Sequence, residues 1–344
     1  MAWKHYQVVF RVLSPLHIGY RKVGNLMQTR SYVLGRNLWG AITARLVRDA
    51  GKGNDAQAYF VMGEVVRSCF RFGYLYPAIP RQEEGRKNRS GNVEPYFPWD
   101  SKAVPFDYLF LSSYASTSLD YEFQAALAGS LHETEFISPC TRPLRGTAWE
   151  GGWGEEADAL GLPVYLIGDL WVAEDCQKQW QDWIKSNEGK KKFKDVSDLL
   201  KFWCAGKLSS WRQALDKIQL GGERGYGWGR VELLEGYPLE CDELIDPRWR
   251  WDKTATNDVV LEGEEGAFLL AHTLAVSDNG KPLDIADDIE GPIEPLVGRE
   301  TRMNEKTGFG VVLSQARICW TPGDKIGKKL RVIVDWDGVW KPIS

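Results

Sequence analysis

The sequence has no stretch of apolar residues long enough to cross a membrane, which would take about 20 consecutive residues. Its first residues, 1–5, include a tryptophan, a lysine and a histidine, and they lead into no apolar signal core. We therefore expect a soluble, cytoplasmic protein that has no membrane partner.

Cysteine and histidine are scarce and scattered. There are six cysteines and four histidines, with no C-x-x-C pair and no histidine at the spacing of a metal ligand. This pattern predicts reduced, mostly buried thiols, with neither a metal site nor a cofactor. The acidic cluster Asp287, Asp288 and Glu290 is interpreted as a surface turn. The cysteines are Cys69, Cys140, Cys176, Cys204, Cys241 and Cys319.

An excess of positive charge is also absent. Lysine and arginine together number 43 and aspartate and glutamate 47, which gives a formal net charge of −4. This balance excludes a protein that coats nucleic acid through its overall field, so any RNA binding must use local basic patches. The sequence also lacks Gly-Lys-Ser and Gly-Lys-Thr, which excludes the phosphate loop of nucleoside triphosphatases.

Glycine, by contrast, is concentrated in one stretch, 221–230, which we call the Gly-rich loop. Five of its ten residues are glycine, interspersed with two arginines and two aromatic residues. Glycine lets the backbone approach a ligand, and free N–H groups in such a turn can bind an anion. Arginine grips phosphate, and aromatic rings offer faces to unstacked bases. The alternative is a tight turn that only connects two elements. The predicted RNA-binding residues here are Gly221, Gly222, Arg224, Gly225, Tyr226, Gly227, Trp228, Gly229 and Arg230.

The first part of the chain predicts a strand, a turn, a second strand and a helix. The strand covers 6–13, the turn 14–19 and the second strand 29–34, and Asn37 is the expected N-cap of the helix. Residues 77–105 are rich in proline, glycine and charge, which predicts a long loop or a partly ordered arm anchored by aromatic side chains.

Further strands are predicted over 135–141 and 162–173. A helical period over 195–217 is expected to lead into the Gly-rich loop and the strand that follows it. Between these elements, the lysine run that begins at residue 190 is interpreted as a solvated tip.

Read together, these elements indicate an α+β fold with two ferredoxin-like domains. The first is a β-α-β-β-α-β unit over 1–245, with an insertion at about 77–135. A polar segment separates it from a second, smaller domain over 246–344. There, Gly308-Phe309-Gly310 again precedes a strand, which suggests two related halves.

Three features follow one another in an order that is typical of a known family. They are Ser-Pro-Leu-His-Ile-Gly at 14–19, Tyr-Val-Leu-Gly-Arg-Asn-Leu-Trp-Gly-Ala at 32–41, and the Gly-rich loop before a strand. This set resembles the RAMP superfamily of CRISPR-associated RNA-binding proteins, which are built from RNA-recognition-motif-like ferredoxin folds with large loop insertions. The family commonly has Pro-Gly-Ser where the helix opens, whereas this chain has Leu34 in place of the proline.

Within that superfamily, the length and layout are most similar to the subunit that caps the 5′ handle of the guide RNA in type III effector complexes. The resemblance implies a non-catalytic subunit with four partners: the CRISPR RNA, target RNA through the complex, a large polymerase-like subunit and backbone RAMP subunits. Two alternatives stay open. One is a metal-independent endoribonuclease that processes repeat RNA, and the other is a backbone subunit that cleaves target RNA with an acidic loop residue and a divalent ion.

His17 separates the binding interpretation from the enzymatic one. Some RNA-cleaving relatives have a catalytic histidine in the turn after the first strand, where it would have to reach a ribose 2′-hydroxyl as a general base. No second acid–base partner is near in sequence, so a hydrogen-bonded or RNA-contacting histidine is favoured. Other candidates surround this turn and the helix N-terminus, which favours phosphate, with one more in a glycine- and proline-rich loop. This second group comprises His17, Gly19, Arg21, Arg30, Arg36, Asn37 and Arg299.

Overall fold

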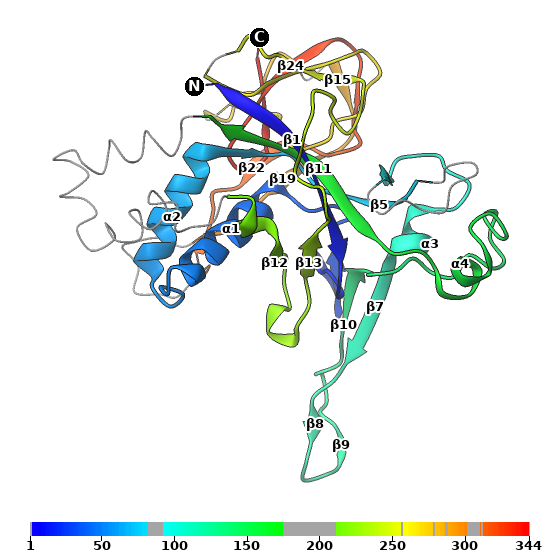
Figure 1. Ribbon diagram of the computed structural model, residues 1–344. Coiled ribbons are helices and arrows are strands. Elements are labelled where there is room, and N and C mark those ends of the chain that lie inside the picture. Colours follow the sequence, from blue (N-terminus) through cyan, green and yellow to red (C-terminus); the bar gives the residue numbers. More distant parts are fainter. Residues whose placement is uncertain are drawn as a thin grey trace.

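The computed structural model describes residues 2–81, 92–174, 211–255, 257–277, 279–285, 288–300, 310 and 312–343. These residues form a mixed α/β structure with few helices and many strands, arranged in two large sheets and a projecting arm (Figure 1). No helix in the described part has both the length and the apolar character needed to cross a lipid bilayer.

The first large sheet has its longest strand pair at the centre and is antiparallel throughout. Its strands are β1 (Trp3–Val12), β4 (Phe70–Phe72), β5 (Tyr76–Pro80), β6 (Val93–Pro95), β11 (Tyr165–Ala173), β12 (Lys217–Gln219), β13 (Arg230–Leu233) and β14 (Leu239–Glu240). The spatial order is β12-β13-β1-β11-β5-β6, with β14 also paired to β1 and β4 to β11. The register of β1 and β11 runs from Trp3 opposite Ala173 to Arg11 opposite Tyr165.

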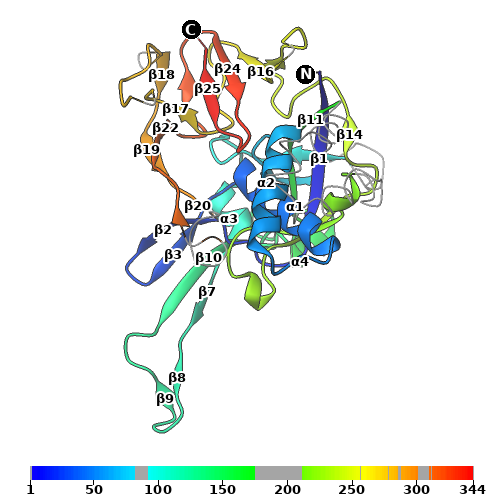
Figure 2. The ribbon, with the colours of Figure 1, turned by 90° about the vertical axis from the view of Figure 1, so that its left-hand side faces the viewer.

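Two helices, α1 (Gly35–Asp49) and α2 (Ala56–Cys69), lie over one face of this sheet (Figure 2). The patterns above yielded no prediction for α2, although the Asp55 carboxylate caps it by accepting the N–H groups of Gln57 and Ala58.

Asn37 is not the N-cap of α1, contrary to the prediction. The helix begins at Gly35, after the extended residue Leu34, and no side chain caps it. The reason is tertiary. A Cβ atom at Gly35 would lie 2.8 Å from the carbonyl oxygens of Phe72 and Asp337, so only glycine lets the helix start against these two segments.

The first sheet has the strand order β13-β1-β11-β5, in which the first strand is central and a late strand lies beside it. This agrees with the predicted β-α-β-β-α-β unit, but residues 175–210 lie outside the described ranges, and with them most of the predicted helix over 195–217. The end of that segment forms a short 3-10 turn over Gln213–Leu215 and then β12. A strand, not a helix, therefore leads into the Gly-rich loop. The ferredoxin-like assignment itself stays a prediction.

A third sheet forms the base of the arm. Its strands are β2 (Gly19–Val23), β3 (Leu26–Thr29), β7 (Leu111–Ser116) and β10 (His132–Ile137), in the order β2-β3-β10-β7. Beyond them, β8 (Leu119–Asp120) and β9 (Ala125–Ala126) close a hairpin that extends away from the body (Figures 1 and 2). We call residues 111–137 the arm.

The predicted insertion at about 77–135 therefore divides into two parts. Its first part is not a long loop, because β5 and β6 belong to the first sheet, and the aromatic anchors Tyr96 and Phe97 are buried. Residues 82–91 lie outside the described ranges. The second part contains the short helix α3 (Phe106–Phe110) and the arm, followed by the helix α4 (Glu155–Leu160) in the next connection.

The second large sheet lies in the C-terminal region. Its strands are β15 (Trp249–Trp251), β16 (Val260–Gly263), β17 (Thr273–Leu274), β19 (Ile293–Leu296), β22 (Arg317–Trp320), β24 (Leu330–Val334) and β25 (Trp340–Pro342), in the order β15-β16-β24-β25-β17-β22-β19. Two small sheets pair β18 (Ile289–Glu290) with β23 (Lys325–Ile326) and β20 (Arg299–Glu300) with β21 (Val312–Leu313).

The second ferredoxin-like domain over 246–344 is not confirmed. The described residues of this region contain no α-helix, whereas a ferredoxin-like unit contains two α-helices. The chain passes from the first large sheet to the second between β14 and β15, and the boundary at 245/246 stays an interpretation. Gly308 and Phe309, on which the suggested duplication depends, lie outside the described ranges.

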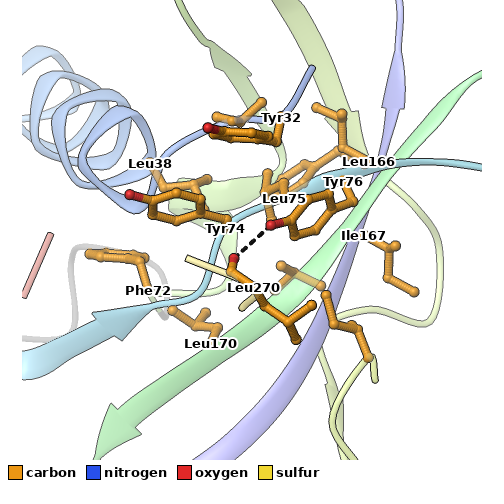
Figure 3. Close-up of a cluster of buried hydrophobic side chains, with 14 of the residues drawn as sticks. Tyr32, Leu38, Phe72, Tyr74, Leu75, Tyr76, Leu166, Ile167, Leu170 and Leu270 are labelled. Atoms are coloured by element: carbon orange, nitrogen blue, oxygen red, sulfur yellow. Dashed lines mark hydrogen bonds between the residues drawn. The ribbon is translucent and has the colours of Figure 1, made fainter. Parts of the chain in front are cut away.

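One hydrophobic core joins the two large sheets. Figure 3 shows Tyr74 and Tyr76 from the first region beside Leu270 from the second, all of them buried. The hydroxyl of Tyr76 donates a hydrogen bond to the carbonyl oxygen of Leu270 at 2.6 Å. The Tyr76 hydroxyl and the Leu270 carbonyl, both buried in this apolar contact, are thus hydrogen-bonded to each other, as buried polar groups generally are.

The prediction of reduced, mostly buried thiols is wrong in part. Cys69 is disulfide-bonded, while Cys140, Cys241 and Cys319 are free, and only the last of these three is buried. A disulfide needs Cα atoms about 4.4–6.8 Å apart, a distance that the fold sets and that separation along the chain does not reveal. Cys176 and Cys204 lie outside the described ranges.

Candidate nucleic-acid interface

The Gly-rich loop connects β12 to β13 and rests on the turn at 14–19. The N–H of Gly222 donates to the carbonyl oxygen of His17 at 2.8 Å, and the N–H of Gly229 donates to that of Pro15 at 2.7 Å. Two sequence features that lie far apart along the chain are therefore in direct contact.

Different glycines of the loop serve different purposes. Gly221 and Gly229 have φ of +74° and +76°, and a Cβ atom there would lie 2.2 Å from the carbonyl oxygen of His17 and 1.9 Å from that of Leu220, respectively. Glycine is therefore required where the loop rests on its neighbours. A Cβ atom at Gly225 would meet no atom within 4 Å, so this residue faces open space.

Only part of the loop backbone is available to an anion. Within the described residues, the N–H groups of Glu223, Arg224 and Gly225 have no acceptor, and Glu223 is in the left-handed conformation with φ +53°. Such consecutive N–H groups can bind an oxyanion. The anion-binding concavity predicted for this loop is therefore smaller than the whole loop, because other N–H groups of the loop donate hydrogen bonds within the protein. Those are the N–H groups of Gly222, Tyr226, Gly227 and Gly229.

The two arginines and the tyrosine of the loop are exposed. Arg224 and Arg230 are exposed, and neither forms an ion pair with any described residue. Nε of Arg230 donates to the carbonyl oxygen of Gly227 at 3.3 Å, which keeps its guanidinium over the loop. Tyr226 is 84% exposed. These side chains keep the charge and the flat face that a nucleic-acid ligand needs.

Trp228 faces the arm instead. Its ring lies edge-on to Phe136 of β10, with centroids 5.1 Å apart, and 6.4 Å from Tyr114 of β7. This geometry is a packing contact. Of the two aromatic residues in the loop, Tyr226 is exposed, whereas Trp228 joins the loop to the arm.

His17 lies beneath the loop, and the residue is only 7% exposed. Its Nδ1–H donates to the carbonyl oxygen of Glu135 at 2.7 Å, while the Glu135 carboxylate accepts the N–H of Thr29 at 2.9 Å. A backbone carbonyl, and no described carboxylate, orients the ring. Among the described residues, no three His, Cys, Asp or Glu side chains gather in a way that could hold a metal ion.

Arg30 of the second candidate group forms an ion pair with the C-terminal region. Its Nη1 lies 2.6 Å from Oε1 of Glu294, and the two side chains are 10% and 14% exposed. Burial alone would raise the pKa of Glu294, but its hydrogen bond with His272 and the charge of Arg30 lower that pKa to about 2. Burial lowers the pKa of His272, and its neutral ring also pairs with the hydroxyl of Tyr74 at 2.8 Å.

Arg36 likewise forms an ion pair with the C-terminal region, since its Nη2 lies 2.8 Å from Oε1 of Glu300. Arg21 is exposed and donates to the side chain of Gln28 at 2.7 Å. Arg299 is exposed in β20, far along the chain from the Gly-rich loop. Gly19 is exposed at the start of β2, and Asn37 lies in the first turn of α1.

A sequence profile of the RAMP superfamily matches residues 9–232, which is more than half of the chain. The chain therefore belongs to the RAMP superfamily. The match includes the turn at 14–19 and the whole Gly-rich loop. None of the curated proteins compared with the sequence matches it.

Several solved structures are similar at low sequence identity. A chain of the type III-B Cmr-beta complex bound to cognate target RNA and AMPPnP is 12% identical, with 93% of this chain and 85% of that chain covered and a TM-score of 0.45. The oligomeric Cmr4 from Pyrococcus furiosus is 13% identical, with 68% and 98% covered and a TM-score of 0.26. These values assign no subunit role to this chain.

Proposed function

We propose that this chain is a non-catalytic RNA-binding subunit of a type III CRISPR effector complex, in which the Gly-rich loop grips the 5′ handle of the CRISPR RNA. The observation that carries the proposal is the placement of the loop on the turn at 14–19. It leaves Arg224, Arg230 and Tyr226 exposed beside a short run of unpaired N–H groups. Membership of a superfamily of RNA-binding proteins supports the same ligand.

The chemistry of this surface suits a single strand. The guanidinium groups of Arg224 and Arg230 pair with phosphates, and the N–H groups at 223–225 add neutral donors to an oxyanion. A base stacked on Tyr226 contributes about 1–3 kcal/mol. Because the chain carries a net charge of −4, binding depends on these few contacts and not on a general field.

The surroundings of His17 support a binding role without cleavage. A general base must reach the proton that it abstracts, whereas this ring is buried below the loop and held by the carbonyl of Glu135. In this proposal the other partners are target RNA, the large polymerase-like subunit and backbone RAMP subunits. The proposal also treats 1–245 and 246–344 as its two domains.

The test is a variant in which Arg224→Ala and Arg230→Ala are combined. RNA of repeat sequence should bind much more weakly, and the slope of log affinity against log salt should fall by about two, one for each lost phosphate contact. The matched control is Arg250→Ala, whose side chain in β15 is 75% exposed and should leave both quantities unchanged. Unchanged affinity and slope in the double variant, with an intact fold, would show that the loop is structural.

A further inference from the structure

A histidine, an aspartate and a cysteine meet where the first large sheet joins the connection to the second. His5 lies in β1 and Asp169 in β11, and both are buried. Cys241 follows β14, and its thiol is free and partly exposed. Nε2 of His5 lies 2.9 Å from Oδ1 of Asp169, and Nδ1 lies 3.7 Å from Sγ of Cys241. We call these three residues the thiol cluster.

The geometry of the thiol cluster gives His5 a positive charge. Its Nε2 faces the Asp169 carboxylate, and its Nδ1 lies 2.8 Å from the carbonyl oxygen of Cys241. Because both oxygens accept hydrogen bonds and donate none, each ring nitrogen carries a hydrogen and the ring is an imidazolium. Burial alone would lower the pKa of His5, but its hydrogen bonds with Asp169 and Cys241 raise that pKa to about 10.

The imidazolium separates the sulfur from the carboxylate. Its Nδ1–H edge faces Cys241, whereas Asp169 lies at the Nε2 edge and is itself held by the N–H of Ile245 at 3.3 Å. An adjacent imidazolium favours the thiolate, which is the nucleophilic form of cysteine. A thiol next to a histidine that a third group orients is the arrangement by which proteins activate a nucleophile. The thiol cluster therefore has the geometry of a reactive site.

Two buried donors without an acceptor flank the thiol cluster. The ring centroid of His5 lies 5.1 Å from that of Trp171 and 6.0 Å from that of Trp251. The indole Nε1 of each tryptophan is buried and has no hydrogen-bond partner in the described part of the chain. A buried donor that lacks an acceptor is energetically costly. An oxygen atom added to Sγ of Cys241 would bring an acceptor into these surroundings.

We propose that Cys241 is a peroxide-reactive site, at which a hydroperoxide oxidises the thiol to a sulfenic acid. The sulfur attacks one peroxide oxygen, so that an S–O bond forms while the O–O bond breaks. The sulfur loses two electrons and the peroxide gains them. The thiol proton ends on the leaving oxygen, which departs as water when the oxidant is hydrogen peroxide. His5 favours the thiolate, and Asp169 positions His5.

The first experiment compares two cysteines within one protein. The purified full chain is treated with hydrogen peroxide and dimedone, which labels sulfenic acids, and mass spectrometry quantifies the labelled peptides over time. Cys140 is the internal control, because it is also free and is more exposed than Cys241. We expect Cys241 to be labelled at least about tenfold faster. Labelling of Cys140 at an equal or higher rate would overturn the inference.

The second experiment removes the charge beside the sulfur. His5→Gln keeps a hydrogen-bonding side chain and should lower the labelling rate of Cys241 at least about tenfold. The rate at Cys140 should stay the same, which a general loss of structure would not allow. An unchanged rate at Cys241 in a folded His5→Gln protein would contradict the role of the imidazolium. If this variant fails to fold, the comparison of Cys241 with Cys140 in the original chain decides.

This inference does not depend on the proposed function. Cys241→Ser should abolish the label at this position and leave RNA binding unchanged. The combined Arg224→Ala and Arg230→Ala variant should in turn keep the labelling rate of Cys241. Slow labelling of Cys241 in a chain that binds RNA would overturn this inference alone. Rapid labelling in a chain that binds no RNA would overturn the proposed function alone.

Discussion

The Gly-rich loop and the arm are neighbours with opposite chemistry. The loop is short, carries two exposed arginines and rests on the turn at 14–19 through backbone hydrogen bonds. The arm is long, contains no lysine or arginine and ends in exposed apolar side chains. A net charge of −4 averages over both. The comparison shows that one net charge can average over surfaces of different local charge.

The Gly-rich loop and the arm are nevertheless in direct contact. Trp228 packs on Phe136, and the backbone carbonyl of Glu135 holds His17 beneath the loop. The Gly-rich loop and the turn beneath it therefore rest directly against the base of the arm. The predictions below test this comparison, beginning with the change that should have the largest effect.

Gly229→Ala should displace the Gly-rich loop from the turn at 14–19. Its Cβ atom would lie 1.9 Å from the carbonyl oxygen of Leu220, at a φ of +76°, so we expect a loss of at least about 2 kcal/mol in the free energy of unfolding together with loss of RNA binding. Gly225→Ala is the matched control, because its Cβ atom meets open space. Denaturant unfolding and RNA titration measure both. Equal effects of the two changes would mean that glycine is no more necessary at position 229 than at position 225.

Tyr226→Ala and Trp228→Ala should separate ligand binding from packing. Tyr226→Ala should weaken RNA binding by about 1–3 kcal/mol, the value of one stacked base, and leave stability unchanged. Trp228→Ala should lower stability by a similar amount and increase hydrogen exchange in β7 and β10, because it removes the contact with Phe136. The reverse pattern would place the base on Trp228.

Glu294→Gln should show that Arg30 belongs to the contact between the two regions. The folded-state pKa of Glu294 is lowered from 4.5 to about 2, so its stabilising effect is present above about pH 4.5 and is lost as the pH falls toward 2. We expect the variant to be less stable at neutral pH and to lose less stability across that acid range. Melting curves from pH 7 to pH 2 measure this, and parallel curves for the two proteins would contradict it.

His17→Ala should have the smallest effect of these changes and should leave the rate of RNA cleavage almost unchanged. Purified protein should leave repeat and target RNA intact, and assemblies with the variant should still cut target RNA at near-normal rates through their other subunits. A lost hydrogen bond to RNA would cost about 0.5–3 kcal/mol in affinity, whereas loss of a general base would lower a rate roughly 10²–10⁴-fold. Cleavage by the protein alone that disappears in the variant would identify an endoribonuclease.

The prediction at the Gly-rich loop rests on local composition. Glycine, arginine and aromatic residues between 221 and 230 predict a phosphate-binding loop, and Arg224, Arg230 and Tyr226 are exposed there, while RNA binding itself stays a prediction. The absence of lysine and arginine between 103 and 141 was equally visible. That absence predicts no surface by itself, because the sequence does not show that these residues project from the body. The apolar residues at 58, 61, 62, 65 and 66, after Asp55, could likewise have predicted α2.

By itself the sequence determined the superfamily, the position of the loop and the charge of each surface, because these follow from residues that are adjacent along the chain. Only the tertiary structure decided which side chains remain available. Arg30 and Arg36 look like Arg224 in sequence, yet each forms an ion pair with a glutamate of the C-terminal region. Trp228 resembles Tyr226, yet it packs on the arm. The physical reason is that contacts with residues distant along the chain decide whether a charged or aromatic side chain stays available to a ligand. A local sequence pattern contains no information about those contacts.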